Sequence, residues 1–275
     1  MNNRIKITSF LTFTALSSLL VIGCNTIGKI ALEQPSHANQ STQLTVSAAA
    51  SLKNVIEDIE PLYQEKHPET EIIYNFGSSG SLQRQIEQGA PVDVFISAAS
   101  KQMNALEEKQ LLSTETRRDL LKNQMVLITS ETNAKNNPKF DNFDDLTNQQ
   151  IKTIALGEPK SVPAGKYAQE VLTSFQITDK VNSKAVYGKD VRQVLNYVAT
   201  GNADAGIVYR TDVQITDNVK IIATAPENSH SPVVYPVAVI KDSQHPEEAQ
   251  DLIEFLTTPE AQEIFEENGF VTMDN

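Results

Sequence analysis

The chain has 275 residues, of which 40% are hydrophobic and 21% charged, a composition typical of a globular protein. Its formal net charge of -12 opposes binding to nucleic acid or to an anionic membrane surface, because like charges repel. The single cysteine excludes an intrachain disulfide.

Residues 1–24 have the pattern of an export signal. Arg4 and Lys6 precede an apolar run, residues 7–22, and the segment ends in Val21-Ile22-Gly23-Cys24. This ending resembles a lipobox, in which the cysteine is lipidated and becomes the mature N-terminus. Two alternatives are a plain signal peptide cut after Ala38 and an uncleaved membrane anchor. All three place the body of the protein outside the cytoplasmic membrane.

The polar residues 25–43 predict a tether, and strands and helices alternate from Leu44 onward. We expect strands at residues 44–49, 72–76, 92–97, 125–129, 151–156, 205–209, 220–223 and 233–240. We expect helices after Ser51, around residues 82–86, 103–106, 168–175 and 191–198, and at 249–256 and 259–267. The stretch 130–139 reads as a loop, and Pro236 predicts an edge or a bulge in the last strand.

This alternation indicates an α/β fold with mainly parallel sheets. The number and order of the strands favour two lobes rather than one sheet. We expect lobe I to comprise residues 44–122 and 225–275, and lobe II residues 123–224. Because ligands of such sheets bind beyond the carboxyl ends of the strands, we expect the site between the lobes.

Two serines near the start follow strands and precede helices. Ser51 and Ser79 each occupy a predicted N-cap, where a hydroxyl lies beside unpaired backbone N–H groups at the positive end of the helix dipole. Two such helix starts facing each other would form a cradle for an oxyanion. The alternative for each serine is an ordinary cap. The segment around Ser79 lacks the last glycine of a nucleophile elbow.

The second half contains two more helix starts and a tyrosine at a strand end. Pro163 opens one helix and leaves the backbone amide of Ala164 free to donate to an anion. Asp190 caps another helix and leaves the backbone amide of Val191 free in the same way. Tyr209 ends a predicted strand, from which its hydroxyl could reach a cleft. The alternatives are routine helix starts and a half-buried tyrosine.

Taken together, these segments resemble the molybdate-binding proteins of bacterial ABC importers, in order and from Leu44 to the C-terminus. The matching segments are Ala48-Ala49-Ala50-Ser51-Leu52, Phe76-Gly77-Ser78-Ser79, residues 89–98, Gly157-Glu158-Pro159, Val162-Pro163-Ala164-Gly165, Asp190-Val191-Arg192, Gly206-Ile207-Val208-Tyr209, residues 235–239 and Asn268-Gly269-Phe270. The resemblance implies a two-lobed, type II periplasmic binding protein fold. It also implies that serine and tyrosine hydroxyls and backbone amides bind the oxyanion, here Ser51, Ser79, Ala164, Val191 and Tyr209.

The resemblance implies an extracytoplasmic receptor that captures molybdate and tungstate through neutral donors and delivers the anion to membrane permease subunits. We expect a monomer that is not an enzyme, uses no cofactor and binds no nucleic acid. The dispersed histidines lack zinc-site spacing, and the sequence contains no Walker motif. Two alternatives stay open: a receptor for another tetrahedral oxyanion such as sulfate or phosphate, and a secreted serine hydrolase that uses Ser51 or Ser79.

Overall fold

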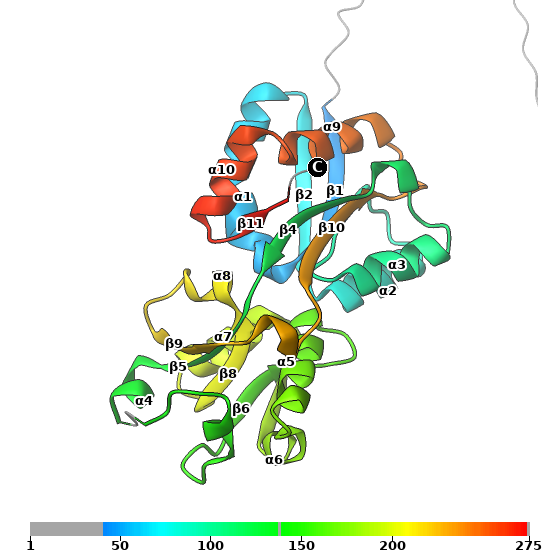
Figure 1. The fold of residues 1–275 in the computed structure, drawn as a ribbon. Coiled ribbons are helices and arrows are strands. Elements are labelled where there is room, and N and C mark those ends of the chain that lie inside the picture. Colours follow the sequence, from blue (N-terminus) through cyan, green and yellow to red (C-terminus); the bar gives the residue numbers. More distant parts are fainter. Residues whose placement is uncertain (1–40, 137–138, 274–275) are drawn as a thin grey trace, which may run out of the picture. The chain divides into compact units, whose positions relative to one another are not determined.

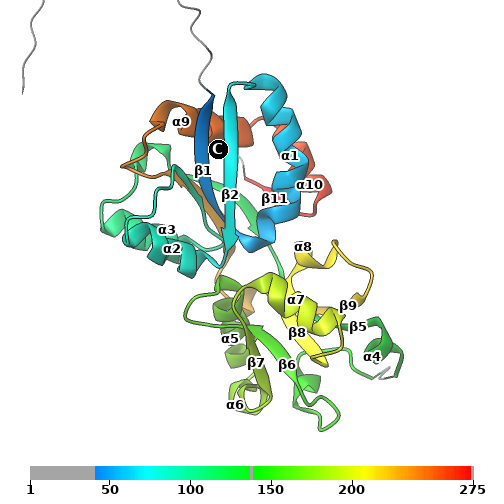
Figure 2. The same ribbon diagram turned by 180° about the vertical axis from the view of Figure 1, so that it is seen from behind.

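The computed structural model describes residues 41–136 and 139–273, which belong to one compact unit (Figure 1). The predicted export signal with Cys24, and most of the predicted tether, lie outside these residues. The described chain forms two β-sheets, each packed against helices (Figures 1 and 2). We call the six-stranded sheet with its helices the first lobe and the five-stranded sheet with its helices the second lobe.

The first lobe contains both ends of the described chain. Its strands are β1 (Thr42–Ala49), β2 (Thr70–Gly77), β3 (Val94–Ile96), β4 (Arg118–Asn123), β10 (Val233–Val239) and β11 (Val271–Thr272), in the order β11-β4-β10-β3-β1-β2. Its helical elements are the 3₁₀ turn η1 (Ala50–Leu52), α1 (Lys53–Lys66), α2 (Ser79–Glu87), α3 (Ser100–Glu108), the 3₁₀ turn η2 (Thr114–Thr116), α9 (Pro246–Leu256) and α10 (Pro259–Glu267).

Apolar residues at helical spacing dock these helices onto the sheet. Helix α1 buries Val55, Ile56 and Ile59 at intervals of three and four residues, which places them on one face of the helix. Helices α2 and α3 bury a separate cluster around Phe95 of β3. This packing fixes the carboxyl ends of β1 and β2, which lie at the same end of the sheet and lead into η1 and α2.

The second lobe consists of the chain between its passage out of the first lobe after Asn123 and its return after Thr224. Its strands are β5 (Met125–Ser130), β6 (Ile154–Gly157), β7 (Ala185–Gly188), β8 (Ala205–Tyr209) and β9 (Val219–Thr224), in the order β7-β6-β8-β5-β9. Its helical elements are α4 (Glu131–Asn136), the 3₁₀ turn η3 (Asp144–Thr147), α5 (Pro163–Ser174), α6 (Thr178–Asn182), α7 (Val191–Ala199) and α8 (Arg210–Val213). The 3₁₀ turn η4 (Glu227–Ser229) lies on the return to the first lobe.

The α/β class is confirmed, but the expectation of mainly parallel sheets was wrong in detail. Strands β1, β2 and β3 pair in parallel, as do β6, β7 and β8. Strands β4, β5, β9, β10 and β11 join these groups through antiparallel pairs. Strand β4 carries the chain out of the first lobe and β10 carries it back, so these two neighbours run in opposite directions, and β5 and β9 are related in the same way in the second lobe.

Strand β10 shows how Pro236 is accommodated inside a sheet. The sequence predicted an edge or a bulge at this position. The strand lies between β3 and β4, so it is not an edge, and its register shifts between Tyr235 and Pro236. The extra residue of this bulge is Leu120 of β4, so the ladder is interrupted where Pro236 has no N–H to donate, while the Pro236 carbonyl still accepts from Ser97 N at 3.0 Å.

Some elements were not predicted. Strand β4 was not predicted because charged residues flank its apolar pair, Leu120 and Leu121, and strands β7 and β11 were not predicted because they are short. Residues 131–136, predicted as loop, form the short helix α4, none of whose residues is buried. No helix among the described residues has both the length and the apolar character needed to cross a bilayer.

Candidate functional site

The five residues singled out by sequence surround one small cavity between the lobes. Its lining residues are Ala49, Ala50, Ser51, Gly77, Ser78, Ser79 and Ala98 from the first lobe, and Val162, Pro163, Ala164, Asp190, Val191 and Tyr209 from the second. The volume open to the centre of a water molecule is about 10 Å³. A space of this size, about that of one water molecule, is too small for a sugar or a peptide.

Ser51 reaches the cavity from the turn that follows β1. It is the middle residue of η1, whose N-cap position is Ala49, so the expected N-cap role for Ser51 was wrong. The helical stretch begins one turn earlier than its apolar stripe indicates, because the small residues Ala49 and Ala50 allow a tight 3₁₀ turn. As an early residue of that turn, Ser51 keeps an amide without a helical partner. Its hydroxyl lies 3.0 Å from the hydroxyl of Tyr235.

Ser79 also differs from its expected place in the helix. It is the first residue of α2, and Ser78 occupies the N-cap position. The Ser79 oxygen accepts a hydrogen bond from the amide of Ala98 at 2.9 Å. Since a hydroxyl has one proton to donate, this contact leaves the Ser79 proton available to a ligand.

The amide of Ala164 is brought to the cavity by close packing of a helix start against a strand end. Pro163 is the first residue of α5 and Ala164 the second, so the Ala164 amide has no partner within the helix. A Cβ at Gly165 would collide with the Gly157 carbonyl, and one at Gly157 would lie 2.6 Å from a Val162 methyl. The two glycines therefore let α5 begin directly against the end of β6.

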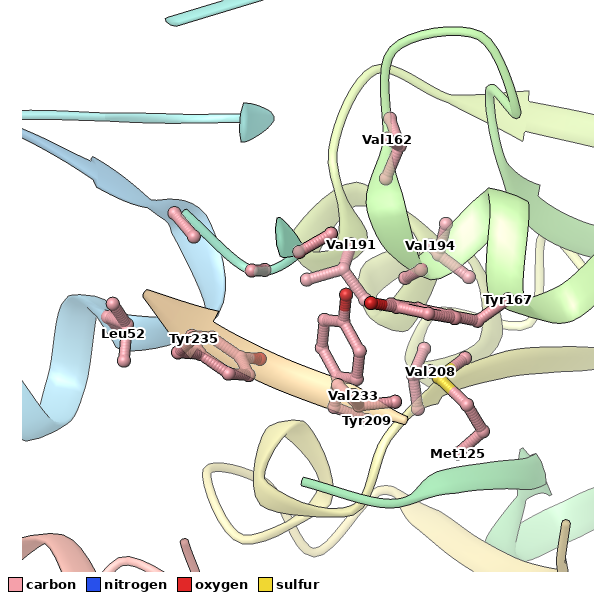
Figure 3. Close-up of a cluster of buried hydrophobic side chains, with 14 of the residues drawn as sticks. Leu52, Met125, Val162, Tyr167, Val191, Val194, Val208, Tyr209, Val233 and Tyr235 are labelled. Atoms are coloured by element: carbon pink, nitrogen blue, oxygen red, sulfur yellow. The ribbon is translucent and has the colours of Figure 1, made fainter. Parts of the chain in front are cut away.

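Val191 and Tyr209 complete the second-lobe side. Asp190 caps α7 by accepting from Gln193 N at 2.9 Å, and Val191 is the first helical residue. Tyr209 ends β8, and its buried hydroxyl has no hydrogen-bond partner in the described part of the chain. Figure 3 shows this hydroxyl directed toward Val191. Burial raises the pKa of Tyr209, so the phenol stays neutral and can donate.

A cation lies directly behind the cavity, although no lysine or arginine is among its lining residues. Arg192 donates from Nε to the Ala50 carbonyl at 3.1 Å and from Nη2 to the Ser51 carbonyl at 2.8 Å. Its Nε also lies 3.1 Å from Asp212 Oδ1. Burial raises the pKa of Asp212 to about 6, although the Arg192 charge acts in the opposite direction. Arg192, held by Asp212, thus binds helix α7 of the second lobe to η1 of the first.

A second contact between the lobes lies next to the cavity. The amide of Gly80 donates to the Ser161 carbonyl at 3.0 Å. A Cβ at Gly80 would lie 2.6 Å from that oxygen, a separation that real Cβ atoms do not show. This approach of the lobes therefore requires glycine at position 80.

Three polar residues behind Ser51 were given no role from the sequence. Asn123 donates to Thr211 Oγ1 at 2.8 Å and to the Tyr235 hydroxyl at 3.4 Å, and Tyr235 contacts Ser51. Tyr235 and Arg192 were quoted only as parts of matching segments. Nothing in the local pattern shows that residues so distant in the chain meet at Ser51.

The geometry does not suit a serine hydrolase. None of the residues that line the cavity is a histidine, the base of a Ser-His-Asp hydrolase. Residues 41–136 and 139–273 also contain no group of three or more His, Cys, Asp or Glu side chains that could hold a metal ion.

Comparisons with known proteins agree with this geometry. One relative is a Bacillus subtilis protein, YvgL, which is named as an ABC transporter substrate-binding lipoprotein. It is 41% identical over 252 residues, which cover 92% of this chain and 93% of that protein. The molybdate-binding protein ModA of Haemophilus influenzae is 36% identical, covering 84% and 90%. A solved substrate-binding domain from Clostridium difficile, named for a molybdenum ABC transporter, is 46% identical with a TM-score of 0.66, covering 85% and 100%.

Two of these relatives are named for ABC transporters, and the third is named for molybdate binding. A family model described as bacterial extracellular solute-binding protein matches residues 44–271, which include every element that contributes to the cavity. The chain therefore belongs to the family of bacterial extracellular solute-binding proteins.

Proposed function

We propose that this protein captures molybdate, and also tungstate, for an ABC importer. The observation that carries the proposal is the convergence of hydroxyls and helix-start amides from both lobes on one small cavity without a lysine or arginine in its lining. The proposed ligands are Ser51, Ser79, Ala164, Val191 and Tyr209. The relatives named for molybdate or molybdenum support the same choice.

Neutral donors suit a buried dianion. Burying an ion is costly unless hydrogen bonds replace its hydration, and fixed donors at helix starts do so without a proton that must move. We expect binding to depend little on salt or on mild changes of pH. Selectivity then rests on the size of the cavity and on donor geometry, so tungstate should bind like molybdate and the smaller sulfate should bind poorly.

Calorimetric titration of the protein from Ser41 onward, which keeps strand β1 whole, tests the proposal. Molybdate and tungstate should each give one saturable site per chain, with sulfate and phosphate far weaker. Tight sulfate binding without a response to molybdate would assign the cavity to the alternative oxyanion. Salt added to the molybdate titration should leave the affinity nearly unchanged.

The remaining proposals concern the setting in which the protein acts. We propose that it works as a monomer, without binding nucleic acid, and passes its anion to the permease subunits. We also propose the lobe boundaries 44–122 with 225–275 and 123–224, supported by β9 ending at Thr224 and, to within one residue, by β4 ending at Asn123. Lipidation of Cys24 is supported by the lipobox pattern and by the lipoprotein name of one relative. Mass spectrometry of the mature N-terminus tests it.

A further inference from the structure

Residues 225–232, which we call the return segment, carry the chain from β9 of the second lobe to β10 of the first. The segment starts bound to the second lobe, because the Ala225 amide donates to the Met125 carbonyl of β5 at 2.9 Å. Its 3₁₀ turn η4 packs against α5. Pairing with the first-lobe strand β4 begins at Val233, which lies opposite Asn123. By its contacts the return segment therefore belongs to the second lobe, although it follows the last strand of that lobe.

Helix α5 of the second lobe holds the far end of the return segment. The Glu170 carboxylate accepts from the Ser231 amide at 2.6 Å, and the Tyr167 hydroxyl donates to the Pro232 carbonyl at 3.3 Å. The Tyr167 ring also meets the His230 ring edge to face, with 6.0 Å between their centroids. Tyr167 and Glu170 are three residues apart, so they lie on one face of α5. We call these contacts the α5 clamp.

The α5 clamp contains a charged acceptor. The second oxygen of Glu170 lies 3.4 Å from Lys166 Nζ. Burial raises the pKa of Glu170, but the hydrogen bonds from Ser231 and the charge of Lys166 outweigh it and leave the pKa below its usual value. The carboxylate is therefore ionised at neutral pH. A hydrogen bond to an ionised acceptor is stronger than one between neutral groups, so the clamp holds Ser231 firmly.

Two cavities flank the end of the return segment. One of about 660 Å³ lies between the segment and α3 of the first lobe, and one of about 320 Å³ lies between it and the end of β4. Pro232 lines both cavities. Because proline has no N–H, a turn of the chain at this residue breaks no hydrogen bond from its nitrogen. Val233 lies opposite Asn123, where the chain leaves the first lobe, so turns at these two neighbouring places share one axis.

We propose that the returning strand pivots at Pro232–Val233, and that Tyr167 and Glu170 are positioning residues that make the return segment move with the second lobe. This pivot lies further along the chain than the end of β9, where the sheets change. The helix that offers the Ala164 amide to the anion then also holds the hinge, so anion binding acts on the hinge through one rigid helix. The inference rests on the proposed function, because the pivot serves closure of the lobes around the anion.

Chemical bridges from the return segment to either lobe test the proposal. Cys24 is the only cysteine of the chain, so the protein from Ser41 onward can be given chosen cysteine pairs. Ser231→Cys is joined by a short bis-maleimide to Lys166→Cys on α5 or to Lys101→Cys on α3. All three residues line the larger cavity. Ser231→Cys keeps the backbone amide that the α5 clamp uses.

The readout is the dissociation rate of molybdate after bridging in its presence. The bridge to α3 joins two lobes that move apart, so it should slow dissociation by at least about tenfold. The bridge to α5 joins parts of one moving body and should leave the rate within about twofold of the unbridged pair. Equal rates for the two bridges, or slowing by the α5 bridge alone, would overturn the inference.

Removing the α5 clamp tests the two positioning residues. In Tyr167→Phe with Glu170→Ala the return segment is no longer held by α5, so the α3 bridge should slow dissociation by no more than about twofold. If that pair of substitutions does not fold, Tyr167→Phe alone should reduce the effect of the α3 bridge. The matched control is Tyr187→Phe, an exposed tyrosine on β7, which should leave the effect unchanged. An undiminished effect in the folded clamp variant contradicts the role given to Tyr167 and Glu170.

Failure of the proposed function gives a different result. An unmodified protein that binds no molybdate refutes that function and leaves the pivot to be read without a ligand. Small-angle scattering then measures the radius of gyration of the free protein, which the α3 bridge should reduce and the α5 bridge should not. The opposite order, or no difference, overturns the inference.

Discussion

Replacing Arg192 by lysine should weaken molybdate binding far more than it affects folding. Lysine keeps the positive charge beside Asp212, but its ammonium group cannot reach two carbonyls as the guanidinium fork does. Arg192 donates across the lobes to Ala50 O at 3.1 Å and Ser51 O at 2.8 Å. Losing one hydrogen bond that involves a charged group costs about 1.5–3 kcal/mol.

The affinity change follows from where these contacts lie. They join the two lobes, so they contribute only when the lobes are together around the cavity. The dissociation constant for molybdate should therefore rise by roughly 10- to 150-fold, the equivalent of that free energy. The free energy of unfolding of each lobe should change much less, because the ion pair with Asp212 lies within the second lobe.

Calorimetry gives the affinity, and stopped-flow tyrosine fluorescence gives the dissociation rate, which should carry most of the change. The matched control is Arg84→Lys, because Arg84 is exposed on α2 and its side chain donates to Ser81 of its own lobe. Equal molybdate affinities for Arg192→Lys, Arg84→Lys and the wild type would refute the reasoning.

Further expectations concern the serines, the lobe contact and the buried carboxylate. Ser51→Ala and Ser79→Ala should each weaken molybdate binding by about 1–3 kcal/mol in calorimetry, and unchanged affinity in both would mean that neither hydroxyl binds the anion. Gly80→Ala should also lower the affinity, because its Cβ would meet the Ser161 carbonyl, whereas Ser161→Ala keeps that carbonyl and serves as the control. The pKa of Asp212 rises from 3.8 to about 6 on folding, so its contribution to stability is present below pH 3.8 and is lost as the pH rises through 6. Chemical denaturation should therefore show wild type losing about 3 kcal/mol relative to Asp212→Asn across this window, and parallel curves would contradict it.

The sequence predicted the parts of the site that depend on local chemistry. A strand, small residues and a serine indicate a helix start, and Pro163 and Asp190 mark two further starts by their capping preferences. The structure places the five predicted residues around one cavity. The N-cap assignment of Ser51 failed because a 3₁₀ turn has too few residues to leave a periodic signature.

The layer behind the cavity could not be predicted in this way. Asn123 and Tyr235 lie 112 positions apart in the chain, and they meet because β4 and β10 pair antiparallel where the chain crosses between the lobes. The same crossings made the sheets mixed rather than mainly parallel. Long-range pairing of this kind leaves no trace in local periodicity.

Arg192 offers a way for a protein of net charge -12 to attract a dianion without placing a cation in the cavity. The Ala50 carbonyl that it binds belongs to the same peptide group as the amide of Ser51, a residue that lines the cavity. A hydrogen bond to the oxygen of a peptide polarises the whole group and makes its N–H more electropositive. The positive charge of Arg192 thus acts on the cavity by polarising the Ala50–Ser51 peptide group. The guanidinium itself stays outside the cavity, in contact with Asp212 and the backbone.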